Sequence, residues 1–213
     1  MSGSDINLSQ LINNDATIKS NVESLEIYSE RHPFSLTLRI SNFENEATYK
    51  KFVKNCEMII RRSVEYNEWR DYIIDVLQVN ECAITSERME DTTIQIHHHV
   101  PSLYTLVTAL VNKNIEENIS FCTFDICTKA IEIHFQNRVG YVALLSSMHE
   151  KFHNGKLNVP INLIKGDYQY FVREYSKYLD ESEIEKIQTR LAVNEHNVSW
   201  SRDNYPEAAT GGR

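Results

Sequence analysis

Histidine is the residue type whose placement in this chain most strongly suggests chemistry. Five of the eight histidines lie in two short segments. His97, His98 and His99 directly follow a stretch of alternating apolar and polar residues, which predicts a β-strand that ends in imidazoles. His149 and His153 are four residues apart. That spacing places both of their imidazoles on one face of an α-helix.

The helix that carries the second pair has recognisable boundaries. Ser147 and Glu150 form the pattern of an N-terminal capping box, and Gly155 follows as a C-terminal stop. Two imidazoles on one helix face, with a third from a neighbouring strand, can bind a divalent metal ion. Imidazoles without a carboxylate suit Zn²⁺, Ni²⁺ or Mn²⁺ better than Mg²⁺, which prefers oxygen ligands. The sequence therefore predicts one divalent metal ion, with its identity among Zn, Mn, Ni and Mg left open.

The residues before the histidine run extend this pattern. Cys82–Thr85 and Thr92–Ile96 have a strand-like composition and flank a polar, turn-like stretch, which predicts a β-hairpin that leads into the histidines. A hairpin that ends in His-His and is followed by a His-x-x-x-His helix resembles the ββα-metal core of the colicin-type HNH endonucleases, over roughly residues 78–155. The resemblance implies metal-dependent hydrolysis of phosphodiester bonds in DNA.

The resemblance also implies a role for each matching residue. His97, His149 and His153 match the metal ligands of the HNH motif, His98 matches its general base, and Asn137 matches the asparagine that orients the base. In this interpretation a neutral His98 takes a proton from the attacking water. The metal ion stabilises the charge that develops at phosphorus and on the leaving oxygen.

The chain departs from the HNH pattern in three ways. Residues 99–136 separate the predicted base from the predicted asparagine, so the core must contain a helical insertion. Three consecutive histidines leave the register open, with His98 and His99 as the alternative to His97 and His98. Paired Cys-x-x-Cys motifs are absent from the sequence. Two other classes stay open: a non-catalytic HNH-like structural or regulatory protein, of phage origin, that acts through protein–protein contacts, and a hydrolase of small phosphoesters.

Charge argues against nucleic-acid binding by the chain as a whole. The chain has 213 residues, of which 24% are charged, and a net charge of −8, whereas binding to DNA normally rests on Lys and Arg side chains that neutralise phosphates. One dense basic segment with helical spacing provides a candidate surface for DNA, and its cations are Lys50, Lys51, Lys54, Arg61 and Arg62. The alternative for this segment is an ordinary solvated helix face.

Cysteine spacing and hydropathy bear on the compartment. The four cysteines show neither zinc-site nor disulfide-scaffold spacing, which fits a reducing compartment. No N-terminal segment resembles a signal peptide, and no apolar run approaches the ~20 residues that span a bilayer. We therefore expect a cytoplasmic location, in the host cytoplasm if the chain is phage-encoded, and no membrane partner.

Hydrophobic periodicity predicts an α+β fold that is mostly helical, and the resemblance to the HNH endonucleases implies a small ββα-metal core within it. The N-terminal segment is predicted to contain a strand at Phe34–Ile40 and helices at 46–66 and 68–77. The insertion is predicted to contain two helices, which begin near Pro101 and Thr123. Further helices are expected at 167–179 and 181–193. The chain then divides into a flexible lead-in (1–23), a strand and helix segment (24–78), the HNH-like core with its insertion (79–157), C-terminal helices (158–193) and a disordered tail (194–213).

Overall fold

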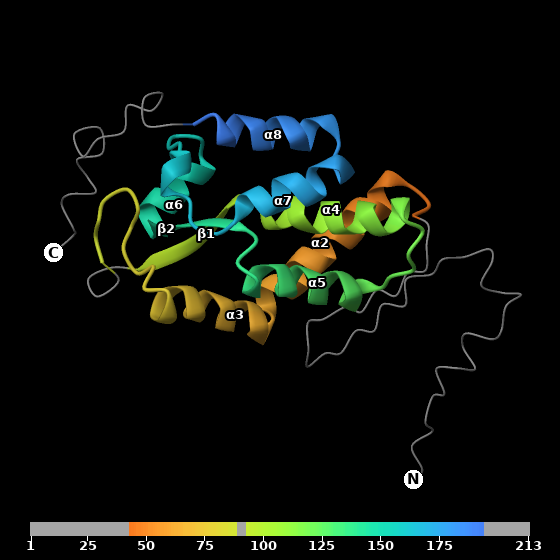
Figure 1. The fold of residues 1–213 in the computed structure, drawn as a ribbon, viewed down its shortest axis with the longest axis horizontal. Helices are drawn as coiled ribbons and strands as arrows, with labels where there is room; N and C mark the ends of the chain where they lie inside the picture. Colours follow the sequence, from red (N-terminus) through yellow and green to blue (C-terminus); the bar gives the residue numbers. More distant parts are fainter. Residues whose placement is uncertain (1–42, 89–92, 194–213) are drawn as a thin grey trace, which may run out of the picture.

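The computed structural model describes residues 43–88 and 93–193 (Figure 1). The predicted lead-in, the strand at Phe34–Ile40 and the predicted tail lie outside the described residues. The α-helices and strands, in chain order, are α2 (Glu46–Arg62), α3 (Val64–Asp71), β1 (Ile94–Val100), α4 (Leu103–Glu116), α5 (Thr123–Phe135), β2 (Gly140–Leu145), α6 (Ser146–His153), α7 (Tyr168–Tyr175) and α8 (Glu181–Leu191). A π-helical turn at Tyr72–Val76 extends α3, and short 3₁₀ helices occupy Ile161–Leu163 and Ser176–Tyr178.

The described part of the chain has one two-stranded sheet, in which β1 pairs antiparallel with β2. His97 lies opposite Val142 and His98 opposite Tyr141, and the register shifts between His98 and Val100. Every residue of β2 is buried, because helices cover both faces of the sheet. An apolar strand such as β2 is stable only when both of its faces are covered. The small sheet within a mostly helical chain confirms the predicted α+β class.

The predicted hairpin before the histidines is wrong. Cys82–Thr85 forms a turn, in which the Ser86 N–H donates to the Cys82 carbonyl oxygen at 2.8 Å, and a single bridge joins Glu81 to Arg88. β1 pairs instead with β2, which comes after two helices. The apolar, partly β-branched sequence of β2 offers β1 an extended partner that is buried along its length, whereas Cys82–Thr85 reverses direction within four residues and provides no strand. The predicted helical insertion is present as α4 and α5, which lie between the strands along the chain.

The helices of the insertion pack together with α2 and form a bundle beside the sheet (Figure 1). α2 begins with a capping box between Asn45 and Thr48 and buries one apolar face, whose residues are Phe52, Val53, Cys56 and Ile60. α4 buries most of its length, since it lies between α2, α5 and α7. The Ser102 hydroxyl caps its N-terminus by accepting from the Thr105 N–H at 3.0 Å.

Two pairs of helices enclose the sheet. α6 and α8 pack against β1 on one face, and α3 and α5 lie on the other side of the sheet (Figure 1). Trp69 of α3 and His134 of α5 contact His98 on that second face. α6 follows β2 without a linker and is anchored by the fully buried Met148. Its N-cap is Leu145, which makes no side-chain capping bond, so the predicted Ser147–Glu150 capping box is wrong. Gly155 does end the segment after α6, with a φ of +68° that suits glycine.

No helix in the described ranges is both long and apolar enough to cross a membrane.

Candidate metal centre

Three imidazoles from two elements meet at the junction of β1 and α6. His97 projects from β1, and His149 and His153 project from α6, with one ligand atom from each within 4.8 Å of the others. The ring centroid of His97 lies 4.9 Å from that of His149 and 5.1 Å from that of His153. The Nε2 atoms of His149 and His153 are 3.2 Å apart. We call these three residues the metal-centre histidines.

The local sequence explains why the metal-centre histidines converge. Side chains alternate between the faces of a strand, and this alternation directs His97 toward α6. The four-residue spacing of His149 and His153 stacks their rings on one side of the helix, with centroids 4.4 Å apart. Phe152, between them in sequence, packs on the His97 ring at 4.4 Å and forms an apolar wall of the site.

Burial keeps the imidazole of His97 neutral. Burial, followed by the neighbouring His149 and His99, lowers the pKa of His97 to about 2. Burial and then His153 also lower the pKa of His149 below its ordinary value. Neutral imidazole is the form that binds metal ions.

The spacing of the two helical imidazoles suits a small divalent ion, and a ring nitrogen of His97 lies within 4.8 Å of both. Metal–nitrogen bonds of about 2.0–2.1 Å in a tetrahedral site separate ligating nitrogens by about 3.3 Å, close to the 3.2 Å between the helical Nε2 atoms. Nε2 of His97 is buried and has no hydrogen-bond partner among the described residues. A buried imidazole nitrogen without a partner is costly, and a metal ion would satisfy it.

His98 faces the opposite side of the sheet. Its Nδ1 lies 3.3 Å from the Tyr66 hydroxyl oxygen and its Nε2 lies 2.7 Å from Nε2 of His134. Its ring stacks on Trp69, with the planes 7° apart and the centroids separated by 5.3 Å. We call His98 and His134 the core histidine pair.

The hydrogen bonds of the core histidine pair fix where the protons are. Nδ1 of His134 lies 2.6 Å from the Ala130 carbonyl oxygen, which can only accept, so Nδ1 carries a proton. Nε2 of neutral His134 then accepts from Nε2–H of His98. Nδ1 of His98 in turn accepts from the Tyr66 hydroxyl. Burial lowers the pKa of His134 to about 4 and that of His98 well below its ordinary value, so both rings are neutral.

The structure does not place the predicted base or its orienting asparagine at the metal centre. Both ring nitrogens of His98 are bonded on the face away from α6, because neighbouring strand residues point to opposite faces. Asn137 is exposed in the turn after α5, with a φ of +57°, and its carbonyl oxygen accepts from the Asp167 N–H at 2.7 Å. Tyr66 and His134, rather than Asn137, are the hydrogen-bond partners of His98.

His99 lies on the same face as His97, and the two ring centroids are 6.4 Å apart. It is 1% exposed, and its carbonyl oxygen accepts from Arg190 Nη1 of α8 at 2.5 Å. The alternative register, with His98 and His99 in place of His97 and His98, therefore does not match the three-residue cluster, which contains His97.

The basic segment is an exposed face of α2. Its five cations, Lys50, Lys51, Lys54, Arg61 and Arg62, are all exposed. Lys50 pairs with Glu46 at 2.6 Å and Arg61 with Glu57 at 2.8 Å, each one helical turn away. These carboxylates offset part of the positive charge.

Several residues that complete the two faces of β1 carry no recognisable motif in the sequence. Tyr66 and Trp69 surround His98, and Arg190 reaches the backbone of His99. His134 packs in the core, where it is 1% exposed. Strand alternation within the histidine run was the signal that could have separated His98 from its two neighbours.

The fold and the site together define a mostly helical α+β protein with a three-histidine candidate metal centre. The family model of the Bacteriophage G278-like virion proteins matches residues 1–205. The chain therefore belongs to this family, which supports the expected phage origin. No HNH nuclease family matches the chain. No curated protein and no solved structure matches it either.

Proposed function

We propose that the chain is a non-enzymatic structural component of the phage particle, in which one divalent metal ion fastens α6 to the sheet. The observation that carries the proposal is the convergence of three imidazoles from β1 and α6, within a chain of a virion protein family. A metal ion that is bound by two elements opposes their separation, because the free energy of metal binding is added to the free energy of unfolding.

Zn²⁺ suits this ligand set best, since three neutral imidazoles and no carboxylate favour borderline ions over Mg²⁺. Ni²⁺ and Mn²⁺ are the next candidates. His97 would hold the ion from the buried side, while the half-buried His149 and the exposed His153 would hold it from the solvent side. When bound, such an ion can hold α6 against β1 or polarise a fourth ligand.

A structural role is favoured over catalysis by the position of His98. A general base must reach the water that it deprotonates, directly or through one further water. Both nitrogens of His98 are already bonded within the core, and the side chain is 6% exposed. In a structural role the chain would act through protein–protein contacts in the particle.

Purified phage particles provide the test of the virion role. We expect the chain in the particles, and we expect particles that carry H149A/H153A to lose heat resistance relative to wild-type particles. E150Q, an exposed change on the same helix, is the matched control and should behave as wild type. Absence of the chain from purified particles would refute the structural role.

A second candidate, an HNH-like nuclease, is favoured by one observation. The units β1, β2 and α6, with one histidine on β1 and two on α6, resemble the ββα-metal arrangement. In this candidate the exposed cations of α2 would contact DNA. The test is nicking of supercoiled plasmid by the protein with single metal ions. Nicking that is lost in H149A/H153A and in chelator, but kept in E150Q, would support the nuclease and contradict a purely structural role.

A further inference from the structure

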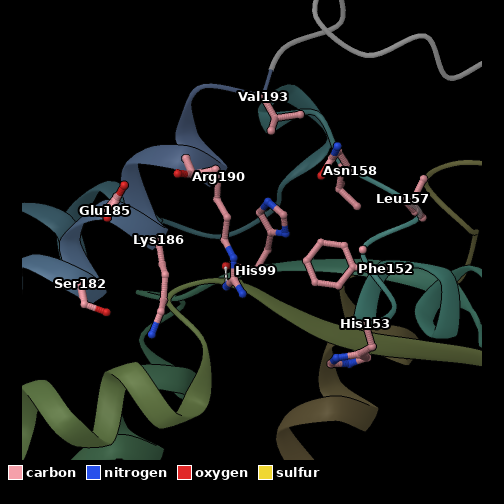
Figure 2. Close-up of a pocket in the computed structure, with 13 residues that line it drawn as sticks. His99, Phe152, His153, Leu157, Asn158, Ser182, Glu185, Lys186, Arg190 and Val193 are labelled. Carbon is pink, nitrogen blue, oxygen red and sulfur yellow. Dashed lines mark hydrogen bonds between the residues drawn. The ribbon is translucent and has the colours of Figure 1, made fainter.

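A cavity of about 470 Å³ lies next to the metal centre, between α6, the segment after it and α8. Figure 2 shows the imidazole of His99 in the middle of the lining residues, with the Arg190 side chain on one side and Phe152 and Asn158 on the other. Its volume is in the range of small-molecule sites, about 300–1,000 Å³. We call it the α8 pocket.

The imidazole of His99 is buried without hydrogen bonds. Neither Nδ1 nor Nε2 has a partner in the part of the chain that the structure describes. Water cannot readily replace such a partner, because the residue is only 1% exposed. A neutral imidazole always has one N–H to donate and one nitrogen to accept. Leaving both unpaired in the interior is unfavourable. An occupant of the α8 pocket that carries an acceptor oxygen would satisfy the donor.

Arg190 supplies a cation at the same place. Burial is the main influence on its guanidinium and lowers its pKa from the ordinary value, with Glu183 opposing this. One of its N–H groups donates to the His99 carbonyl oxygen, and within the described residues no carboxylate pairs with it. Glu183 pairs instead with Lys186, at 2.5 Å. A partly buried guanidinium with donors to spare is suited to an oxyanion.

The other polar lining residues are compatible with a small anion. Lys186 is paired with Glu183 and Glu185 is exposed, so Arg190 is the lining cation that has no carboxylate partner within the described residues. Thr189 and Asn158 add further groups that can donate hydrogen bonds. Phe152 forms an apolar wall, with its ring 5.8 Å from the Arg190 guanidinium carbon.

We propose that the α8 pocket binds an oxyanion, either a carboxylate or a phosphate group, through the guanidinium of Arg190 and the ring N–H of His99. This site is additional to the metal centre and uses none of the nitrogens assigned to the metal ion. His153 lines the pocket as well, so an anion that binds to the metal ion instead has to be distinguished by experiment.

The test is calorimetric titration of the full chain with inorganic phosphate and, separately, with succinate, in chelator and chloride buffer. We expect saturable binding, with the tighter of the two probes identifying the chemical class. R190Q should weaken binding about tenfold or more, because a charge-assisted hydrogen bond is lost. R173Q is the matched control and should leave affinity unchanged, since Arg173 is exposed on α7 and pairs with Glu174.

A second measurement keeps the proposal testable if R190Q folds poorly. Imidazole ¹⁵N NMR of the wild-type chain should show the His99 resonances moving during the titration, and those of His134 staying in place. Equal affinity in a folded R190Q, an unmoved His99 signal, no binding at about millimolar affinity or tighter, or binding only after zinc is added would each overturn the proposal.

Discussion

The two faces of β1 use the same residue type in opposite ways. On the α3 and α5 face, the core histidine pair has every ring nitrogen in a hydrogen bond, and its rings pack on Tyr66 and Trp69. On the α6 and α8 face, His97 and His99 have buried nitrogens that lack partners among the described residues.

The difference separates structural histidines from binding histidines. A buried polar group with all its hydrogen bonds stabilises one arrangement of the core and has no capacity left for a ligand. A buried polar group without partners costs stability and gains it back when a ligand binds. The number of satisfied ring nitrogens, rather than burial or pKa, is therefore the property that assigns a role to each histidine of the run.

The largest effect is expected from removal of a core histidine. H98A should lower the free energy of unfolding by about 3–5 kcal/mol, because it creates a cavity and leaves the Tyr66 hydroxyl and His134 Nε2 unpaired. Urea denaturation monitored by circular dichroism measures this. H153A, at an exposed site, should change the value by about 0.5 kcal/mol or less in chelator. Similar losses in both variants would erase the distinction between the faces.

The core pair also predicts a dependence of stability on pH. The pKa of His134 is about 4 in the folded protein and about 6.5 when unfolded, so the unfolded chain binds more protons between these values. Stability should therefore be constant above pH 6.5 and fall as the pH drops toward 4. His134 accounts for about 3 kcal/mol of this, at ~1.4 kcal/mol per pKa unit. Urea midpoints measured in chelator across the window test it, and H134Q should flatten the curve.

Zinc should stabilise the protein only through the metal-centre histidines, on the α6 and α8 face of β1. At free Zn²⁺ about 100 times its dissociation constant, we expect the free energy of unfolding to rise by about 2.7 kcal/mol. The rise should vanish in H149A/H153A and persist in E150Q. Thermal or urea unfolding with buffered zinc measures it. Equal stabilisation of the double variant would mean that zinc binds elsewhere.

The smallest effect concerns the basic face of α2. K54E/R62E should change stability by about 0.5 kcal/mol or less, since both side chains are exposed. We also expect no salt-dependent binding of duplex DNA by the wild-type chain, because Glu46 and Glu57 offset two of the five cations. If the wild type does bind DNA and the double variant lowers its salt slope by about two, at ~0.9 for each phosphate contact, α2 is a DNA surface.

Sequence patterns located the helices of the described chain and the residues of the three-histidine cluster. The helix with His149 and His153 and the two inserted helices follow from local periodicity, which is a property of neighbouring residues. The partner of β1 could not be obtained in this way, because pairing with Gly140–Leu145 is a non-local choice that depends on which strand can be buried. The HNH motif does not distinguish the two faces of a strand, whereas strand alternation places His98 on the face opposite His97 and His99.

Zinc X-ray absorption, together with elemental analysis, is the most direct test of the metal centre. We expect one zinc ion per chain, with a coordination shell that contains three imidazole nitrogens at about 2.0–2.1 Å. Zinc content should fall to background in H149A/H153A and stay at one ion per chain in E150Q. A shell without imidazole scattering, or zinc content that is unchanged in H149A/H153A, would contradict the claim that His97, His149 and His153 bind the metal ion.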